Sequence, residues 1–257
     1  ALDHSRTDGS PFVAGPNGEA LDRNPLKDVR VRRALSMAID REAVTSRVME
    51  GAAIPAGQFL PEGVYSHIPG YAPPRFDPDG ARRLLAEAGY PNGLRMSIHG
   101  PNDRYINDAR IIQAVGSFWT RIGVRTQVEA MPWTTFIARA GRQEFSAFLV
   151  GWGSSTGEAS SPLRSLVATF DREKGFGASN RGRYSNPELD RLLDQALATV
   201  DDEKREKLLQ DATRMAMDDV GIIPIHIQKN TWAMKRNLRH DARADELTRA
   251  LDVRPAN

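Results

Sequence analysis

The fold of this chain is decided by the stretch Phe145-Ser146-Ala147-Phe148-Leu149-Val150-Gly151-Trp152-Gly153-Ser154-Ser155-Thr156-Gly157. An apolar run that is rich in β-forming residues and stopped by glycine predicts a buried strand over residues 145–151. The turn that follows combines glycines, hydroxyls and one indole. Loops beyond the carboxyl ends of strands form the ligand crevice of open α/β sheets. We therefore expect Trp152 to stand at the mouth of such a crevice.

Length and composition are those of an ordinary folded chain. The 257 residues suffice for one large domain or two small ones, and 40% hydrophobic residues is typical of globular proteins. A net charge of +2 without long basic runs gives no reason to expect a nucleic-acid partner. The absence of cysteine excludes disulfides and thiolate metal sites. Residues 1–6 lack the apolar core of a signal peptide, so we expect a cytosolic protein or a mature or trimmed chain.

Helix and strand signals alternate around the opening stretch. After a lead-in with one short strand near Phe12, Asp28 and Asp40 are expected to cap two helices, and residues 52–76 form a long loop rich in proline. The remaining expected elements are helices at 77–88, 104–122, 133–142, 160–169, 187–199 and 202–219, and strands at 94–99, 124–128 and 222–227. The strand at 94–99 alternates in polarity and is expected to be half-buried. Strands separated by long helices predict a parallel or mixed sheet with right-handed crossovers.

One motif suggests catalysis. Residues 153–157 match G-x-S-x-G, the nucleophile elbow of α/β-hydrolases, in which Ser155 would attack while Asp190 or Asp194 and His226 complete the triad. That elbow turns directly from strand into helix, whereas residues 157–162 intervene here. His226 also lies in an apolar strand, where a structural histidine is the commoner case. A serine hydrolase therefore stays as an alternative, and the distance from Ser155 to a histidine would test it.

Other chemical signals are weak. The five histidines include no pair at helical ligand spacing, so no metal site is expected, and no nucleotide-binding glycine loop occurs. The run Arg30-Val31-Arg32-Arg33 is expected to be the solvated face of an amphipathic helix.

Three aromatic residues suggest binding instead. Trp133 and Trp152 stand at segment junctions close to glycine or proline, and Tyr184 lies just before the helix cap at 185–187. Each alone could fill a packing gap, but together with a turn of serines they suit a cleft that stacks on a ligand and offers hydrogen bonds. An exposed cleft face could also bind another protein, so a protein-interaction module is a further alternative.

An ordered set of motifs resembles the C-terminal lobe of the family 5 solute-binding proteins, the peptide, dipeptide and nickel receptors of ABC importers. The resemblance covers about residues 25–230, and only the ordered set is specific. Its pieces are residues 28–41, 51–56, 76–78 with 84–90, 132–134, 151–152, 183–190 and 223–225.

This resemblance implies a fold and an organisation. The fold would be α/β, of the periplasmic-binding-protein-like II type, with a mixed sheet flanked by helices as in domain 3 of dipeptide-binding proteins. Residues 1–27 would be a lead-in near the hinge, 28–229 the ligand-binding lobe, and 230–257 a tail that returns to a missing N-terminal lobe. The protein would bind a small, peptide-like solute in the periplasm by clamshell closure and deliver it to the permease subunits of an ABC transporter. It would have no catalytic activity and no cofactor.

The resemblance also implies site residues. Trp133 and Trp152 match aromatic cleft residues of the peptide-binding members, and we include Ser154 and Tyr184 in the expected ligand site. Ser155 falls where those members carry an aspartate that pairs with the α-amino group of a peptide, and a neutral hydroxyl cannot supply that charge-assisted bond. Glu158 could substitute for the aspartate if its loop turns inward. A blocked peptide, a sugar or another small polar solute therefore stays open as the ligand, and nickel is not expected.

Overall fold

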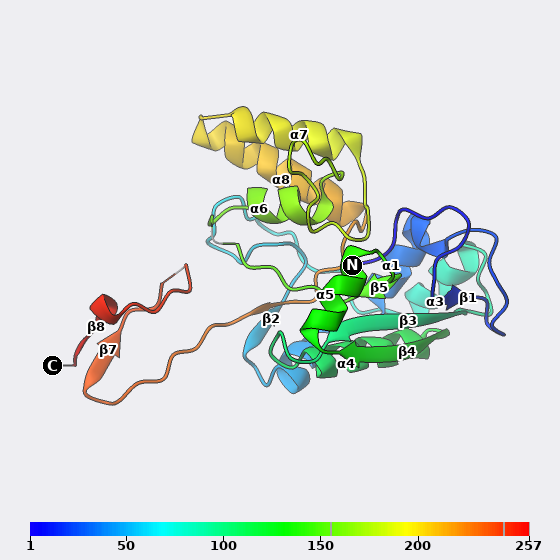
Figure 1. Ribbon diagram of the computed structural model, residues 1–257, viewed down its shortest axis with the longest axis horizontal. Helices are drawn as coiled ribbons and strands as arrows, with labels where there is room; N and C mark the ends of the chain where they lie inside the picture. Colours follow the sequence, from blue (N-terminus) through cyan, green and yellow to red (C-terminus); the bar gives the residue numbers. More distant parts are fainter. Residues whose placement is uncertain (155, 244, 257) are drawn as a thin grey trace.

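The computed structural model describes residues 1–154, 156–243 and 245–256. A mixed sheet with its helices forms one half of the body, and a layer of helices forms the other half (Figure 1). The segment that follows residue 230 extends away from both halves (Figure 1). The predicted α/β fold with a mixed sheet flanked by helices is confirmed.

The sheet is built around β3 (Leu94–Pro101). Strand β4 (Val124–Met131) pairs with it in parallel along its whole length, and helix α4 (Asp108–Arg121) is the crossover between the two. The other edge of β3 is shared by β5 (Ala147–Phe148), which is parallel, and β1 (Val13–Ala14), which is antiparallel. The expected half-buried strand is wrong for β3, because it is the central strand and both α4 and α5 contact it.

The helices of the sheet half begin where the sequence predicts. The Asp28 carboxylate accepts the Arg30 amide at the start of α1 (Val29–Met37), and Asp77 caps α3 (Pro78–Glu87) in the same way. Helix α2 (Arg41–Ala43) begins behind Asp40 and continues as a π-helical turn to residue 48. These elements enclose the larger hydrophobic core, which includes Val31, Leu35, Leu85, Met96, Ile112, Val115 and Trp119.

The helical half has its own core. Helices α7 (Pro187–Ala198) and α8 (Asp202–Asp218) pack against each other (Figure 1). Helix α6 (Ser160–Pro162) runs into the π-helical turn Leu163–Val167, which packs beneath them. The buried side chains here include Leu163, Leu189, Leu193, Leu209 and Ala212.

Two strands differ from the prediction. Strand β5 is shorter than residues 145–151, because after Phe148 only the Leu149 amide still bonds to β3, at the His99 carbonyl. The last strand of the body, β6 (His226–Gln228), pairs antiparallel with β2 (Ala53–Pro55) in a separate two-stranded sheet. The sequence did not predict β2, since residues 52–76 showed no periodicity.

Two further elements complete the described chain. Helix α5 (Trp133–Gly141) follows β4 and packs against β3, and α4 starts at Asp108 rather than at residue 104. The extended segment carries a small hairpin of β7 (Leu238–His240) and β8 (Val253–Pro255). Among the described residues, no helix has the length and apolar character that crossing a membrane requires. The division of the chain at residues 28 and 230 stays a prediction.

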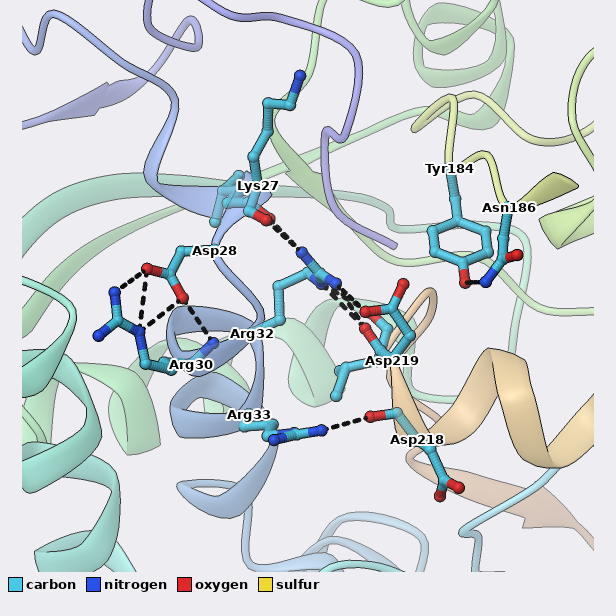
Figure 2. Close-up of polar contacts among 11 residues, drawn as sticks. Lys27, Asp28, Arg30, Arg32, Arg33, Tyr184, Asn186, Asp218 and Asp219 are labelled. Carbon is cyan, nitrogen blue, oxygen red and sulfur yellow. Dashed lines mark hydrogen bonds and ion pairs between the residues drawn. The ribbon is translucent and has the colours of Figure 1, made fainter. Parts of the chain in front are cut away.

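The two halves are joined by a buried arginine. Arg32 was expected on a solvated helix face, and this is wrong, because its side chain is only 4% exposed. Its guanidinium donates to the Asp219 and Val220 carbonyls at the end of α8, to the Lys27 carbonyl at 2.8 Å, and to the Asp219 carboxylate at 2.8 Å (Figure 2). Arg33, one residue on, is exposed and makes a single bond to the Asp218 carbonyl (Figure 2).

Arg32 therefore acts at the carboxyl end of a helix, where a cation interacts favourably with the helix dipole and with unpaired carbonyls. A second buried arginine, Arg41, donates to the Pro224 carbonyl at 2.9 Å, and burial lowers its pKa to about 10. Through these bonds Arg32 and Arg41 hold the segment between α8 and β6 in contact with the sheet half.

Candidate functional site

An open cavity of about 300 Å³ lies at the carboxyl edge of the three parallel strands. Each strand is followed at once by residues that line it: Arg104 and Tyr105 after β3, Trp133 and Ile137 after β4, and Val150–Gly153 after β5. Ser179 and Arg181 of the loop before α7 complete the wall. The expected crevice at the carboxyl edge is thus present, and the structure brings Trp133 and Trp152 together in it.

The two tryptophans on the cavity wall differ in how they are held. Trp133 stacks on Phe136 with ring centroids 5.8 Å apart and meets Tyr105 edge to face at 6.1 Å. Trp152 is 42% exposed, and its indole N–H donates to the Ser161 hydroxyl at 3.2 Å. One indole is therefore fixed by packing, and the other keeps a large free face that a ligand can cover.

Two aspartates hold the loop after β3. The buried Asp108 carboxylate accepts the backbone amides of Arg104 and Tyr105, both at 3.0 Å. Asp103 accepts the Trp133 amide at 2.7 Å and so satisfies a free N–H group at the start of α5. Gly151 is needed opposite, because a Cβ there would lie 2.7 Å from the Tyr105 ring.

The cavity wall is cationic. The Arg104 guanidinium lies over the Trp133 ring at 5.2 Å, and its side chain makes no hydrogen bond or ion pair to any described residue. Arg181 is half-buried and likewise has no side-chain partner within the described ranges. Burial lowers the pKa of the Arg181 guanidinium. No carboxylate of the described residues lines the cavity.

Glu158 is bound to other residues of the protein and does not face the cavity as a free carboxylate. Its carboxylate forms a two-point ion pair with Arg205 of α8, with distances of 2.9 and 2.5 Å, and it also accepts the Ser160 hydroxyl. The hydrogen bonds from Arg205 hold the pKa of the Glu158 carboxyl below its usual value. The Ser154 hydroxyl donates to the Glu158 carbonyl at 2.9 Å. The carboxylate that was expected to substitute for a missing aspartate is therefore used to tie the turn to α8.

Tyr184 lies in the helical core rather than on the cavity wall. It is 3% exposed, contacts His4 edge to face at 5.1 Å, and accepts from the Asn186 side chain at 3.4 Å (Figure 2). A phenol that packs inside the protein cannot stack on a ligand in the open cavity. Ser155, the remaining expected site residue, lies outside the described residues.

The other residues of the supposed catalytic triad give the serine-hydrolase alternative no support. Asp190 accepts the Thr169 amide at 2.9 Å, and Asp194 pairs with Lys174 at 2.7 Å. His226 lies in β6, and burial lowers its pKa. No carboxylate–histidine bond links these three residues, so no general base is oriented for a serine. In the described ranges, no group of three or more His, Cys, Asp or Glu residues is arranged to hold a metal ion.

Several lining residues were missed by sequence reasoning, among them two arginines and a tyrosine. Arg104 and Tyr105 directly follow a predicted strand, so the rule that ligands bind beyond strand ends would have found them. Arg181 gave no signal, because it belongs to an irregular loop that reaches the cavity only through the tertiary fold.

The fold and the cavity define the class of the protein. An α/β unit with an aromatic-lined cavity at the carboxyl edge of parallel strands is an α/β ligand-binding domain. Residues 3–174 match the family model described as bacterial extracellular solute-binding proteins, family 5 Middle. The chain therefore belongs to the family 5 bacterial extracellular solute-binding proteins.

Individual relatives agree with this family. The chain is 31% identical over 210 residues to heme-binding protein A of Haemophilus influenzae, which covers 79% of this chain and 37% of the relative. It is 31% identical over 223 residues to the glutathione-binding protein GsiB of Escherichia coli K12, covering 85% of this chain and 43% of the relative. A crystal structure of the dipeptide-binding protein of Pseudoalteromonas sp. SM9913 with Met-Leu matches with a TM-score of 0.72 at 26% identity, covering 98% of this chain and 51% of that one. The chain thus spans about half the length of these relatives or less.

Proposed function

We propose that this chain is the C-terminal lobe of an extracytoplasmic receptor that binds a small, peptide-like solute for an ABC importer. The observation that carries the proposal is the convergence of Trp133, Trp152 and the loop at Arg104 on one open cavity at the carboxyl edge of the sheet. The partners would be an N-terminal lobe of the same receptor and the permease subunits, and the compartment would be the periplasm. The protein would bind its solute without chemical change.

Clamshell closure explains how such a lobe works. A ligand held by contacts from two lobes favours the closed state over the open one, and only this difference in affinity shifts the population. The cavity here is open to solvent and can cover only part of a ligand's surface. Since a pocket normally buries most of its ligand, the lobe alone should bind weakly and the complete receptor tightly.

A thermal-shift screen tests the proposal. The chain and the complete two-lobe receptor would be melted with dipeptides, glutathione and haem, the ligand types in the names of these relatives. We expect at least one class to raise the melting temperature, with a larger rise for the complete receptor, because binding only the folded state stabilises it by mass action. No shift by any compound in either protein would contradict the proposal.

Replacing the two cavity tryptophans should weaken binding without unfolding the protein. We expect Trp152→Ala and Trp133→Phe each to lower the affinity for the solute found in the screen, by roughly 1–2 kcal/mol for Trp152→Ala and less for Trp133→Phe, because stacked area is lost. Titration calorimetry measures this effect. More than half of Trp152 is covered and its N–H donates to Ser161, so Trp152→Ala should lower the free energy of unfolding by about 1–2 kcal/mol and leave the chain folded.

Trp232→Phe is the matched control for these variants. Trp232 lies in the extended C-terminal segment, where its N–H donates to the Thr248 hydroxyl at 2.8 Å. Its replacement should leave the affinity unchanged. Equal losses in Trp152→Ala and Trp232→Phe would show that the cavity is not the binding site.

A further inference from the structure

The cavity combines features that select a ligand by charge. Its wall carries two guanidinium groups, Arg104 and Arg181, and no carboxylate among the described residues. Neither side chain has a hydrogen-bonding or ion-pairing partner within the described part of the chain. Arg104 is exposed, but Arg181 is half-buried, and a half-buried charge without a partner is costly because buried charges in proteins are normally paired.

Other partly buried arginines near the cavity do have partners within the protein. Arg183, two residues beyond Arg181, covers the Phe170 ring at 4.0 Å and donates to the Asn180 carbonyl at 3.2 Å. Arg205 pairs with Glu158, and Arg139 pairs with Glu144 at 2.9 Å. These partly buried cations are thus bound within the protein, whereas the partly buried Arg181 has no described partner and faces the same cavity as Arg104.

None of the described residues that line this wall offers a carboxylate to an ammonium. Glu158, the expected substitute for the aspartate, pairs with Arg205 at 2.5 Å and is fixed in the turn by the Ser160 hydroxyl. Asp103 and Asp108, which lie beside the cavity, accept backbone amides of cavity-lining residues instead. Position 155 of the sequence holds a serine, which is neutral. An ammonium placed here would lose its hydration beside two guanidinium groups, and both desolvation and like-charge repulsion would oppose it.

We propose that this site selects an organic anion. One or two carboxylates of the anion pair with Arg104 and Arg181, an apolar or flat group rests on the free face of Trp152 beside Trp133, and solutes whose charge at this end is an ammonium are rejected. The inference rests on the proposed function and names the substrate class of that site. Guanidinium groups bind carboxylates through two parallel hydrogen bonds, which gives the pairing its direction as well as its strength. Arg104 already lies over aromatic rings, so a bound carboxylate and a stacked apolar group would be held side by side.

Four probes that share one apolar part and differ in charge test this selection. They are N-succinyl-Ala-Phe with two carboxylates, N-acetyl-Ala-Phe with one, Ala-Phe as a zwitterion, and Ala-Phe amide with only an ammonium. Titration of the chain, followed by tryptophan fluorescence and calorimetry, should give affinities that fall in this order. High salt should lower the affinities of the two anionic probes, because ionic interactions are screened. The order of the zwitterion and the amide should stay unchanged.

Two arginine variants locate the selection. Arg181→Met keeps the apolar stem and should weaken N-succinyl-Ala-Phe about ten- to a hundredfold, the loss expected for one charge-assisted hydrogen bond, with little effect on the amide. Arg183→Met removes the same charge two residues away, outside the cavity wall, and should change affinity by less than about threefold. Thermal melting of both variants shows that they are folded.

The outcomes separate this inference from the proposed function. Equal affinities for the acetylated and amidated probes, or equal losses in Arg181→Met and Arg183→Met, would overturn charge selection while leaving a solute-binding lobe in place. Absence of binding by every probe, together with no thermal shift by any compound in the screen above, would overturn both.

Discussion

Arg32→Ala should destabilise the protein by about 3–5 kcal/mol, the loss typical of removing one partner from a buried, hydrogen-bonded charge. The Arg32 side chain is 4% exposed and bonds to carbonyl groups of both halves of the body, including Lys27 on one side and Asp219 and Val220 on the other. Without it, these carbonyls lose their donors in a buried place and the end of α8 loses its cation. Chemical denaturation measures the change.

Two variants show where this stabilisation comes from. Arg32→Met keeps most of the packing of the stem, so the difference between Arg32→Met and Arg32→Ala isolates the apolar part. Asp219→Ala removes the ion pair alone and should cost about 1 kcal/mol or less, because that carboxylate is 40% exposed and solvent screens it. A loss in Asp219→Ala as large as that in Arg32→Ala would mean that the ion pair, rather than the carbonyl bonds, stabilises the junction.

Arg33→Ala is the matched control. Arg33 is on the same helix and donates to the neighbouring Asp218 carbonyl at 3.0 Å, but it is exposed to solvent (Figure 2). We expect a change of about 0.5 kcal/mol or less. Similar losses in Arg32→Ala and Arg33→Ala would contradict the assignment of Arg32 as the buried link between the halves.

The stability of the protein should fall as the pH drops from about 7 to 4.5, and His4 should account for a measurable share. Burial, with the nearby Arg32 guanidinium adding to it, lowers the pKa of His4 to about 3, and Asp3 opposes this shift only partly. The imidazole Nε2 is buried without a hydrogen-bond partner, and the ring packs against Tyr184. The folded protein therefore holds His4 neutral.

The sign of the effect follows from proton uptake. Below its ordinary pKa of about 6.5 the unfolded chain binds a proton at His4, while the folded chain does not until the pH approaches 3. Between these values the unfolded state holds more protons, so stability is complete above pH 6.5 and is lost as the pH falls. Part of the His4 side chain reaches solvent, so we expect roughly 1–2 kcal/mol from pH 7 to 4.5, less than the full shift would give.

His4→Gln isolates this share. The variant cannot take up the proton, so its free energy of unfolding should vary less with pH between 4.5 and 7 than that of the parent chain. His240→Gln, in the remote C-terminal hairpin, should keep the parent slope. Parallel pH curves for His4→Gln and the parent chain would show that His4 does not titrate differently in the folded and unfolded states.

Local structure could be predicted from the sequence to within a few residues. The side chains of Asp28, Asp77, Asn186 and Asp201 each accept amides at the start of the expected helix. The position of Trp152 beyond a parallel strand also followed, because side chains after the carboxyl ends of parallel strands meet at one edge of the sheet. Capping and strand order depend on residues close in sequence or on a general rule of connection, so the amino-acid sequence by itself determined them.

Pairing and burial were decided only by the tertiary structure. The sequence predicts Arg32 to be a surface residue. It is buried because α8 ends beside it, at Asp219, 187 residues further along the chain. The sequence gives no partner for the Glu158 carboxylate. In the structure Arg205, 47 residues away, pairs with it. Arg181 reaches the cavity through an irregular loop, and Tyr184 from the same loop turns into the core. The charge of a binding site depends on which ionic groups lack an internal partner, and that is a property of distant segments brought together by packing.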